Sequence, residues 1–173
     1  RECGTKLQTG FVGTPYLLHV LSDYGHTDLA YSLLLREQYP SWLYPVTKGA
    51  TTVWEHWDGI MENGDFWSRN MNSFNHYAYG AVADWVYCCA AGITPAEGYP
   101  GYSKVRIAPA PDARLDWLEA SLDTRHGRII SRWKKQDSLW RYEITTPVDA
   151  EVVIDGKTFL VGAGSYIYHS SIQ

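Results

Sequence analysis

The sequence predicts a two-part α+β chain, in which a group of helices is followed by an all-β antiparallel part. Apolar residues recur at helical spacing up to Gly92, whereas short β-branched and aromatic runs separated by turn residues follow it. The charge divides at the same place: residues 1–92 hold 5 Lys+Arg and 9 Asp+Glu, and residues 93–173 hold 10 of each. We therefore expect a helical unit over 1–92, a linker over 93–102 and a β domain over 103–173.

Three helices are expected in the first part. One covers residues 14–24, with Thr14 as N-cap ahead of Pro15. A second covers 27–38, before Pro40, and the short link predicts that it runs antiparallel to the first. A third begins at residue 75 or 77 and continues to 91.

The second part contains six short runs with strand character and one strong hairpin signal. Asp155-Gly156 lies between two apolar runs, and both central positions of a type I′ turn need positive φ. Residues 93–102 are rich in Pro and Gly, which predicts a connector. The predicted strands are 104–108, 115–123, 127–134, 139–145, 151–154 and 165–169.

Composition excludes several classes of function. With 45% hydrophobic and 20% charged residues the chain is globular, and a net charge of −4 without a basic run argues against nucleic acid as a partner. Apolar runs are too short to span a membrane. Three cysteines, Cys3, Cys88 and Cys89, and no visible leader favour a reduced, cytoplasmic location over secretion.

The densest group of reactive and aromatic side chains lies within residues 49–58. Thr52 and Glu55 have the spacing of a capping box, which predicts Glu55 in the first turn of a helix, with an ionised carboxylate suited to act as a base. Spacing alone favours a purely structural cap over the role of a base. Trp54 and Trp57 are candidate walls of a sugar pocket, or core residues.

A second group lies within residues 71–77. Ser73 and Asn75 are candidate caps, and His76 would then occupy a first helical turn as a neutral imidazole that can bond a hydroxyl, or serve a structural role. No phosphate-binding loop, nucleophile elbow or zinc-ligand spacing is present, so no cofactor and no metal are expected.

Four motifs together resemble the C-terminal part of bacterial α-L-rhamnosidases of glycoside hydrolase family 78. They are TGFVGTP (9–15), YPSWLY (39–44), GATTVWEHW (49–57) and NSFNHY (72–77). The resemblance implies the C-terminal helices of an (α/α)6 barrel, hence a partial barrel, followed by a β-sandwich.

The resemblance also implies an inverting hydrolase that removes terminal α-L-rhamnose from glycosides. Glu55 matches the general base and His76 a sugar-binding residue, with Trp54, Trp57 and Asn75 as further substrate-binding candidates. The family's general acid belongs to an upstream segment, so we expect this chain alone to be inactive. Expected partners are rhamnose-containing glycosides, a second copy of the chain, or the missing barrel half.

Two other hypotheses stay open. In the first, the chain is a non-catalytic carbohydrate-binding or structural module on the same scaffold. In the second, it belongs to another (α/α)6 hydrolase or to a lyase. A lyase would require the pocket around Glu55 to accept an acidic sugar, which the few basic residues of 1–92 disfavour.

Overall fold

A computed structural model describes residues 6–172 and divides the chain into two compact units, one ending at Ala83 and the other beginning at Asp84. Cys3 lies outside the described residues. Within residues 6–172, no helix is long and apolar enough to cross a bilayer.

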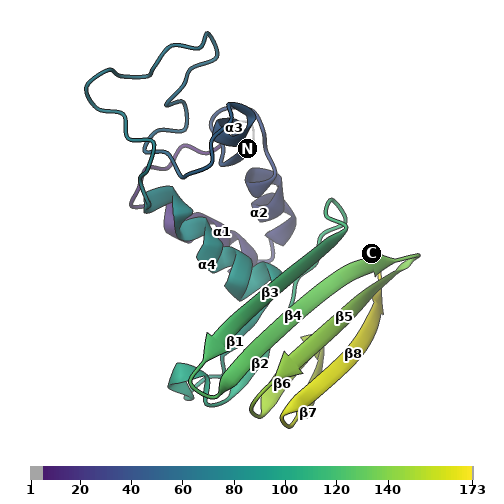
Figure 1. The fold of residues 1–173 in the computed structure, drawn as a ribbon. Helices are drawn as coiled ribbons and strands as arrows, with labels where there is room; N and C mark the ends of the chain where they lie inside the picture. Colours follow the sequence, from purple (N-terminus) through teal and green to yellow (C-terminus); the bar gives the residue numbers. More distant parts are fainter. Residues whose placement is uncertain (1–5, 173) are drawn as a thin grey trace. The chain divides into compact units, whose positions relative to one another are not determined.

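The first unit contains α1 (Thr14–Asp23), α2 (Thr27–Leu34) and α3 (Leu43–Thr47), joined to long irregular segments (Figure 1). Helices α1 and α2 pack against each other, as their short link predicts. The N-cap of α1 is Gly13, not Thr14, because the Thr14 hydroxyl donates instead to the carbonyl of Thr9 at 3.0 Å.

Helix α2 ends four residues earlier than predicted, at Leu34. Its N-cap is His26, with no side-chain capping bond, so Thr27 is the first helical residue and not the cap. The backbone leaves the helical conformation at the C-cap Leu35, with φ of −88° and ψ of 5°, well ahead of Pro40.

The predicted third helix is a continuous run of a 3₁₀, an α-helical and a π-helical segment. It consists of η1 (Ala78–Ala81), α4 (Val82–Trp85) and the π-helical η2 (Val86–Ala90). It therefore begins at Ala78, later than the predicted 75 or 77, because the backbone of residues 73–76 is engaged elsewhere in the unit, as shown below. Gly92, with φ of 74°, follows its end.

The second unit is a sandwich of two four-stranded sheets, ordered β1-β2-β6-β7 and β3-β4-β5-β8 (Figure 1). The described pairs are antiparallel except β2 and β6, which run parallel, so the expected all-antiparallel pairing is wrong at this one place. The strands are β1 (Ile93–Pro95), β2 (Val105–Ile107), β3 (Trp117–Thr124), β4 (Gly127–Gln136), β5 (Leu139–Thr146), β6 (Ala150–Ile154), β7 (Lys157–Val161) and β8 (Gly164–Ser171).

Residues 93–102 are not a plain connector. They include β1 and the short η3 (Pro100–Tyr102), and β1 pairs with β2. Proline is tolerated at the end of an edge strand, where no ladder bond is lost, so Thr94-Pro95 does not prevent pairing. The predicted hairpin between β6 and β7 is confirmed, with φ of 50° at Asp155 and 71° at Gly156.

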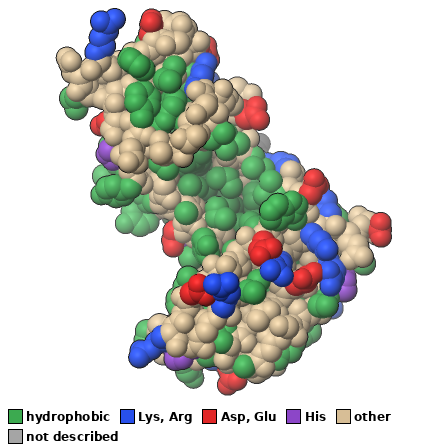
Figure 2. All heavy atoms as spheres, viewed as in Figure 1, with side chains coloured by type: hydrophobic (Ala, Val, Ile, Leu, Met, Phe, Trp, Pro, Cys, Tyr) green, Lys and Arg blue, Asp and Glu red, His purple; other side chains and the backbone are tan. Residues whose placement is uncertain are grey.

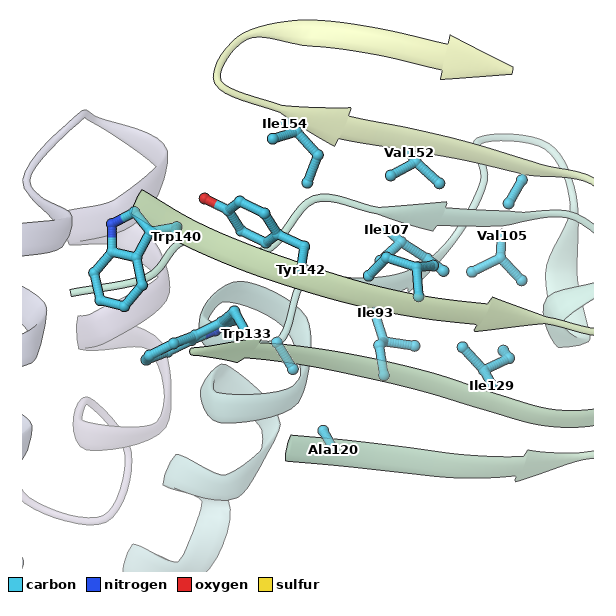
Figure 3. Packing of buried hydrophobic residues seen from close by; sticks show 13 residues of the cluster. Ile93, Val105, Ile107, Ala120, Ile129, Trp133, Trp140, Tyr142, Val152 and Ile154 are labelled. Carbon is cyan, nitrogen blue, oxygen red and sulfur yellow. The ribbon is translucent and has the colours of Figure 1, made fainter. Parts of the chain in front are cut away.

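Apolar side chains of both sheets form the core of the sandwich (Figure 3). Two polar groups anchor the end of η2 to this core: Trp133 Nε1 donates to the Ala90 carbonyl at 2.8 Å, and Ser131 Oγ donates to the Ala91 carbonyl at 2.7 Å. These bonds satisfy carbonyls that a helix end leaves without partners. The labelled core residues are Ile93, Val105, Ile107, Ala120, Ile129, Trp133, Trp140, Tyr142, Val152 and Ile154.

Gly92 is expected to tolerate no side chain. A Cβ there would lie 2.1 Å from the carbonyl carbon of Ala108 and 2.3 Å from the nitrogen of Pro109, and its φ is positive. We expect Gly92→Ala to lower the free energy of unfolding by at least about 3 kcal/mol, measured by urea denaturation. Gly156→Ala is the matched control, because its φ is 71° but the space is open, so its cost is about 1 kcal/mol. Equal losses in the two variants would contradict the predicted clash.

An apolar stripe is exposed along α1. Val12, Tyr16, Val20 and Tyr24 follow at intervals of four residues, and each is at least half exposed. Figure 2 shows hydrophobic side chains, in green, exposed on the surface of the helical unit.

Exposed stripes of this kind mark contact surfaces, so we expect the 173-residue chain to self-associate. The average mass in sedimentation equilibrium should rise with concentration and fall back in a Tyr16→Ser/Val20→Ser variant. A strictly monomeric wild-type chain would contradict this expectation.

Candidate functional site

Two segments distant in sequence run side by side in the helical unit. The amide of Glu55 donates to the Ser73 carbonyl at 2.9 Å, and the amide of His76 donates to the Val53 carbonyl at 2.8 Å. The hydroxyl of Thr52 also donates to a carbonyl of the second segment, that of Phe74. Segments 52–55 and 73–76 are separate clusters in the sequence, and the structure pairs them, as expected if Glu55 and His76 share a site.

The capping box at Thr52 and Glu55 is wrong, since residues 51–58 contain no helix. Both side chains reach across to the other segment instead, and the backbone of 52–55 pairs with 73–76. Because no helix begins here, no helix dipole stabilises the Glu55 carboxylate. The reason is tertiary, because hydrogen bonds across the two segments replace the local bonds that the spacing predicted.

The Glu55 carboxylate is fixed at one oxygen. Oε2 accepts the amide of Ser73 at 2.9 Å, a charge-assisted bond that orients the side chain. His56 Nε2 lies 3.9 Å from Oε1, which is too far for a hydrogen bond. The Glu55 side chain is 20% exposed. One oxygen is thus held while the other stays available within a partly buried site.

His56 was missed by the sequence analysis. Its ring stacks on Trp67 with centroids 3.7 Å apart, and its Nε2 is buried without a hydrogen-bond partner within residues 6–172. Buried polar atoms are normally bonded, so this one marks a place where a ligand or water would complete the site. Its position next to Glu55 was the only signal in the sequence.

His76 lies before the helical run, not in its first turn. Its Nδ1 accepts the amide of Ala78 at 3.4 Å, and its ring stacks on Phe11 with centroids 4.9 Å apart. The acceptor role requires an unprotonated Nδ1, which leaves Nε2 to donate to a hydroxyl. A local bond to Ala78, and not the first turn of a helix, therefore orients the His76 ring.

Trp54 and Trp57 pack into the unit, with 6% and 9% of their surfaces exposed. Trp54 meets Phe74 edge-on, while Trp57 stacks on Tyr79 with centroids 3.7 Å apart. Both line one side of a hollow of about 290 Å³. The structure thus places them as packing residues, and their contact with a substrate stays a prediction.

Other aromatic side chains are better exposed near the paired segments. Tyr77, next to His76, is 89% exposed, and Phe11 and Trp67, which stack on the two histidines, are both exposed. Asn75 is exposed as well, and its backbone amide donates to the Ser73 hydroxyl at 3.2 Å. These groups offer ring faces and polar atoms on the accessible side of the site.

No metal-binding cluster of three or more His, Cys, Asp or Glu occurs within residues 6–172. Cys88 is a poor nucleophile, because burial and the neighbouring Asp84 raise the pKa of its thiol to about 11. Of the groups that could do chemistry, the anchored Glu55 carboxylate has the most suitable setting.

A carboxylate and histidines among aromatic rings, in a chain that continues into a β-sandwich, are typical of a carbohydrate-active protein. The bacterial alpha-L-rhamnosidase 6-hairpin glycosidase domain model matches residues 1–90, and the bacterial alpha-L-rhamnosidase C-terminal domain model matches residues 92–161. The chain belongs to the bacterial α-L-rhamnosidase family.

Curated relatives and solved structures agree with this assignment. An alpha-L-rhamnosidase of Streptomyces avermitilis is 50% identical over 130 residues, 75% of this chain and 12% of the relative, and one of Formosa agariphila is 41% identical over 157 residues, covering 91% and 17%. The crystal structure of a Streptomyces avermitilis alpha-L-rhamnosidase complexed with L-rhamnose has a TM-score of 0.90 at 39% identity, covering 98% of this chain and 18% of that one.

A native rhamnosidase structure from Aspergillus terreus matches with a TM-score of 0.89 at 36% identity, over 95% of this chain and 20% of that one. These matches confirm the predicted fold class, helices of the six-hairpin domain followed by a β-sandwich. The chain spans 12% to 18% of the length of the curated relatives that it matches.

Proposed function

We propose that this chain supplies the general base and part of the rhamnose site of an inverting α-L-rhamnosidase. The observation that carries the proposal is the setting of Glu55: one carboxylate oxygen is bonded to the Ser73 amide, and the other has no hydrogen-bond partner in the described part of the chain. Such a carboxylate can hold its orientation while it accepts a proton.

In the proposed reaction an acid protonates the glycosidic oxygen and the bond from that oxygen to the anomeric carbon breaks. A water molecule attacks the anomeric carbon from the opposite face, and Glu55 Oε1 takes the proton of that water. The acid and base of an inverting enzyme stand about 6.5–9.5 Å apart. We assign the acid to another part of the full-length protein, in line with the share of its relatives that this chain covers.

His76 has the setting of a sugar-binding residue. Its Nε2 can donate to a rhamnose hydroxyl while Nδ1 stays bonded to the Ala78 amide. The stacking with Phe11 holds the ring in place, so the donor is oriented before the sugar binds. Asn75, the residue before His76, is exposed and carries a side-chain amide that can also bond a hydroxyl.

The comparison of wild-type and Glu55→Gln forms of a full-length enzyme that carries this sequence tests the proposal. A large fall in kcat with little change in KM supports a base that acts on water. Unchanged kcat would overturn it, and rhamnose binding without turnover in any form of the protein would favour the non-catalytic carbohydrate-binding module.

A further inference from the structure

A cavity of about 600 Å³ lies at one end of the β-sandwich and is lined by residues of this second unit. The start of β5, the end of β8, the β6–β7 turn and the loop after β2 border it. Protein interiors leave few voids larger than a water molecule, whereas ligand sites measure about 300–1,000 Å³. The volume of this hollow, which opens to solvent, falls within the range of ligand sites.

Two hydroxyl groups bond to each other on the wall of this cavity. Tyr142 Oη and Ser170 Oγ are 3.0 Å apart, and Figure 3 shows the Tyr142 hydroxyl directed toward the end of the core where Trp140 lies. Burial raises the pKa of Tyr142, so its hydroxyl is neutral and can both donate and accept. A hydroxyl-bearing ligand can join such a pair without leaving either group unsatisfied.

The charged groups of the cavity disfavour an anion. The Arg114 guanidinium donates to Asp112 twice, from Nε to Oδ1 at 2.7 Å and from Nη2 to Oδ2 at 2.5 Å, so its charge is already paired with a carboxylate. Asp155 in the β6–β7 turn adds a second carboxylate. With two carboxylates and one guanidinium the lining is net negative, which disfavours an anionic ligand.

Apolar groups make up the rest of the lining. Pro109 and Pro111 come from the loop after β2, Val153 from β6, and the edges of Trp140 and Ile172 complete the wall. Rigid apolar surfaces next to a few fixed polar groups are typical of sites for small molecules. A pyranose presents the matching surfaces, C–H faces for the apolar wall and hydroxyls for the hydroxyl pair.

We propose that this cavity is a second saccharide site, which binds a small neutral sugar through the Tyr142–Ser170 hydroxyl pair and the apolar wall beside it. It is built entirely from residues of the sandwich and does not depend on the function of Glu55. In a glycoside hydrolase such a site would hold a sugar-rich substrate near the enzyme without taking part in bond cleavage.

The test is a titration of the uniformly ¹⁵N-labelled 173-residue chain with L-rhamnose, D-galactose and D-galacturonate, each up to about 50 mM, followed by NMR. We expect saturable shifts of the Trp140 indole and the Ser170 amide with a neutral sugar, and weaker binding of the anionic galacturonate. Ser170→Ala and Tyr142→Phe should each weaken binding about fivefold.

Ser165→Ala is the matched control. It removes a hydroxyl from the same strand that pairs with Thr145 at 2.9 Å across the same β5–β8 pair, but it lies outside the cavity, so binding should not change. Glu55→Gln should also leave these shifts unchanged, which separates this site from the proposed catalytic one. The absence of saturable shifts at the cavity with both neutral sugars, equal weakening by Ser165→Ala, or tighter binding of galacturonate than of galactose would overturn the proposal.

Discussion

Glu55→Gln is expected to lower kcat about 10²–10⁴-fold in a full-length enzyme that carries this sequence, because glutamine cannot take the proton of the attacking water. KM for an aryl α-L-rhamnoside should change little, since His76 and the exposed aromatic rings are untouched. Steady-state kinetics at several pH values measure both quantities.

The substitution should not disturb the fold. The side-chain carbonyl oxygen of the introduced glutamine can still accept the Ser73 amide, so the free energy of unfolding should stay within about 1 kcal/mol of wild type. Asp58→Asn is the matched control, because it removes a carboxylate three residues away that the proposal gives no role. Similar losses of kcat in the two variants would show that charge in this region, and not a base at Glu55, matters.

The 173-residue chain alone is expected to hydrolyse α-L-rhamnosides at least about 100-fold more slowly than a full-length enzyme, because acid and base assistance each contribute at about that level or above. Release of rhamnose by the purified chain measures this. The Glu55→Gln form of the same chain is the control, since residual activity that is equal in both comes from a contaminant.

Efficient turnover by the wild-type chain that Glu55→Gln abolishes would contradict this expectation. It would mean that residues 1–173 contain both an acid and a base. Asp58 and Glu62, which follow Glu55 closely in the chain, would then be the first carboxylates to substitute.

Local signals predicted the β part better than the helical part. Strands β4, β5 and β6 alternate buried residues with more exposed ones, and the Asp155-Gly156 turn needs positive φ at both central positions. Both features depend on residues that are neighbours in the sequence. The parallel pairing of β2 with β6 could not be predicted this way, because it joins segments more than forty residues apart.

In the candidate site, bonds between distant segments replace the structure that local spacing predicted. Thr52 and Glu55 satisfy a local capping pattern, yet both bond to the segment around Ser73. The same tertiary pairing places the segment of His76 beside the segment of Glu55. Spacing alone favoured a structural role for Glu55 over that of a base, and the resemblance of the motifs reversed this order.

Chemical rescue tests the role of Glu55 most directly. In a full-length Glu55→Ala variant no carboxylate activates water, but azide is a nucleophile that needs no base, and it fits the space that the side chain leaves. We expect azide to restore cleavage of an aryl α-L-rhamnoside and to give β-L-rhamnosyl azide, identified by NMR, because attack comes from the face opposite the leaving group. A folded variant that azide does not rescue, or one that yields the α-azide, would contradict the assignment of Glu55 as the base of an inverting enzyme.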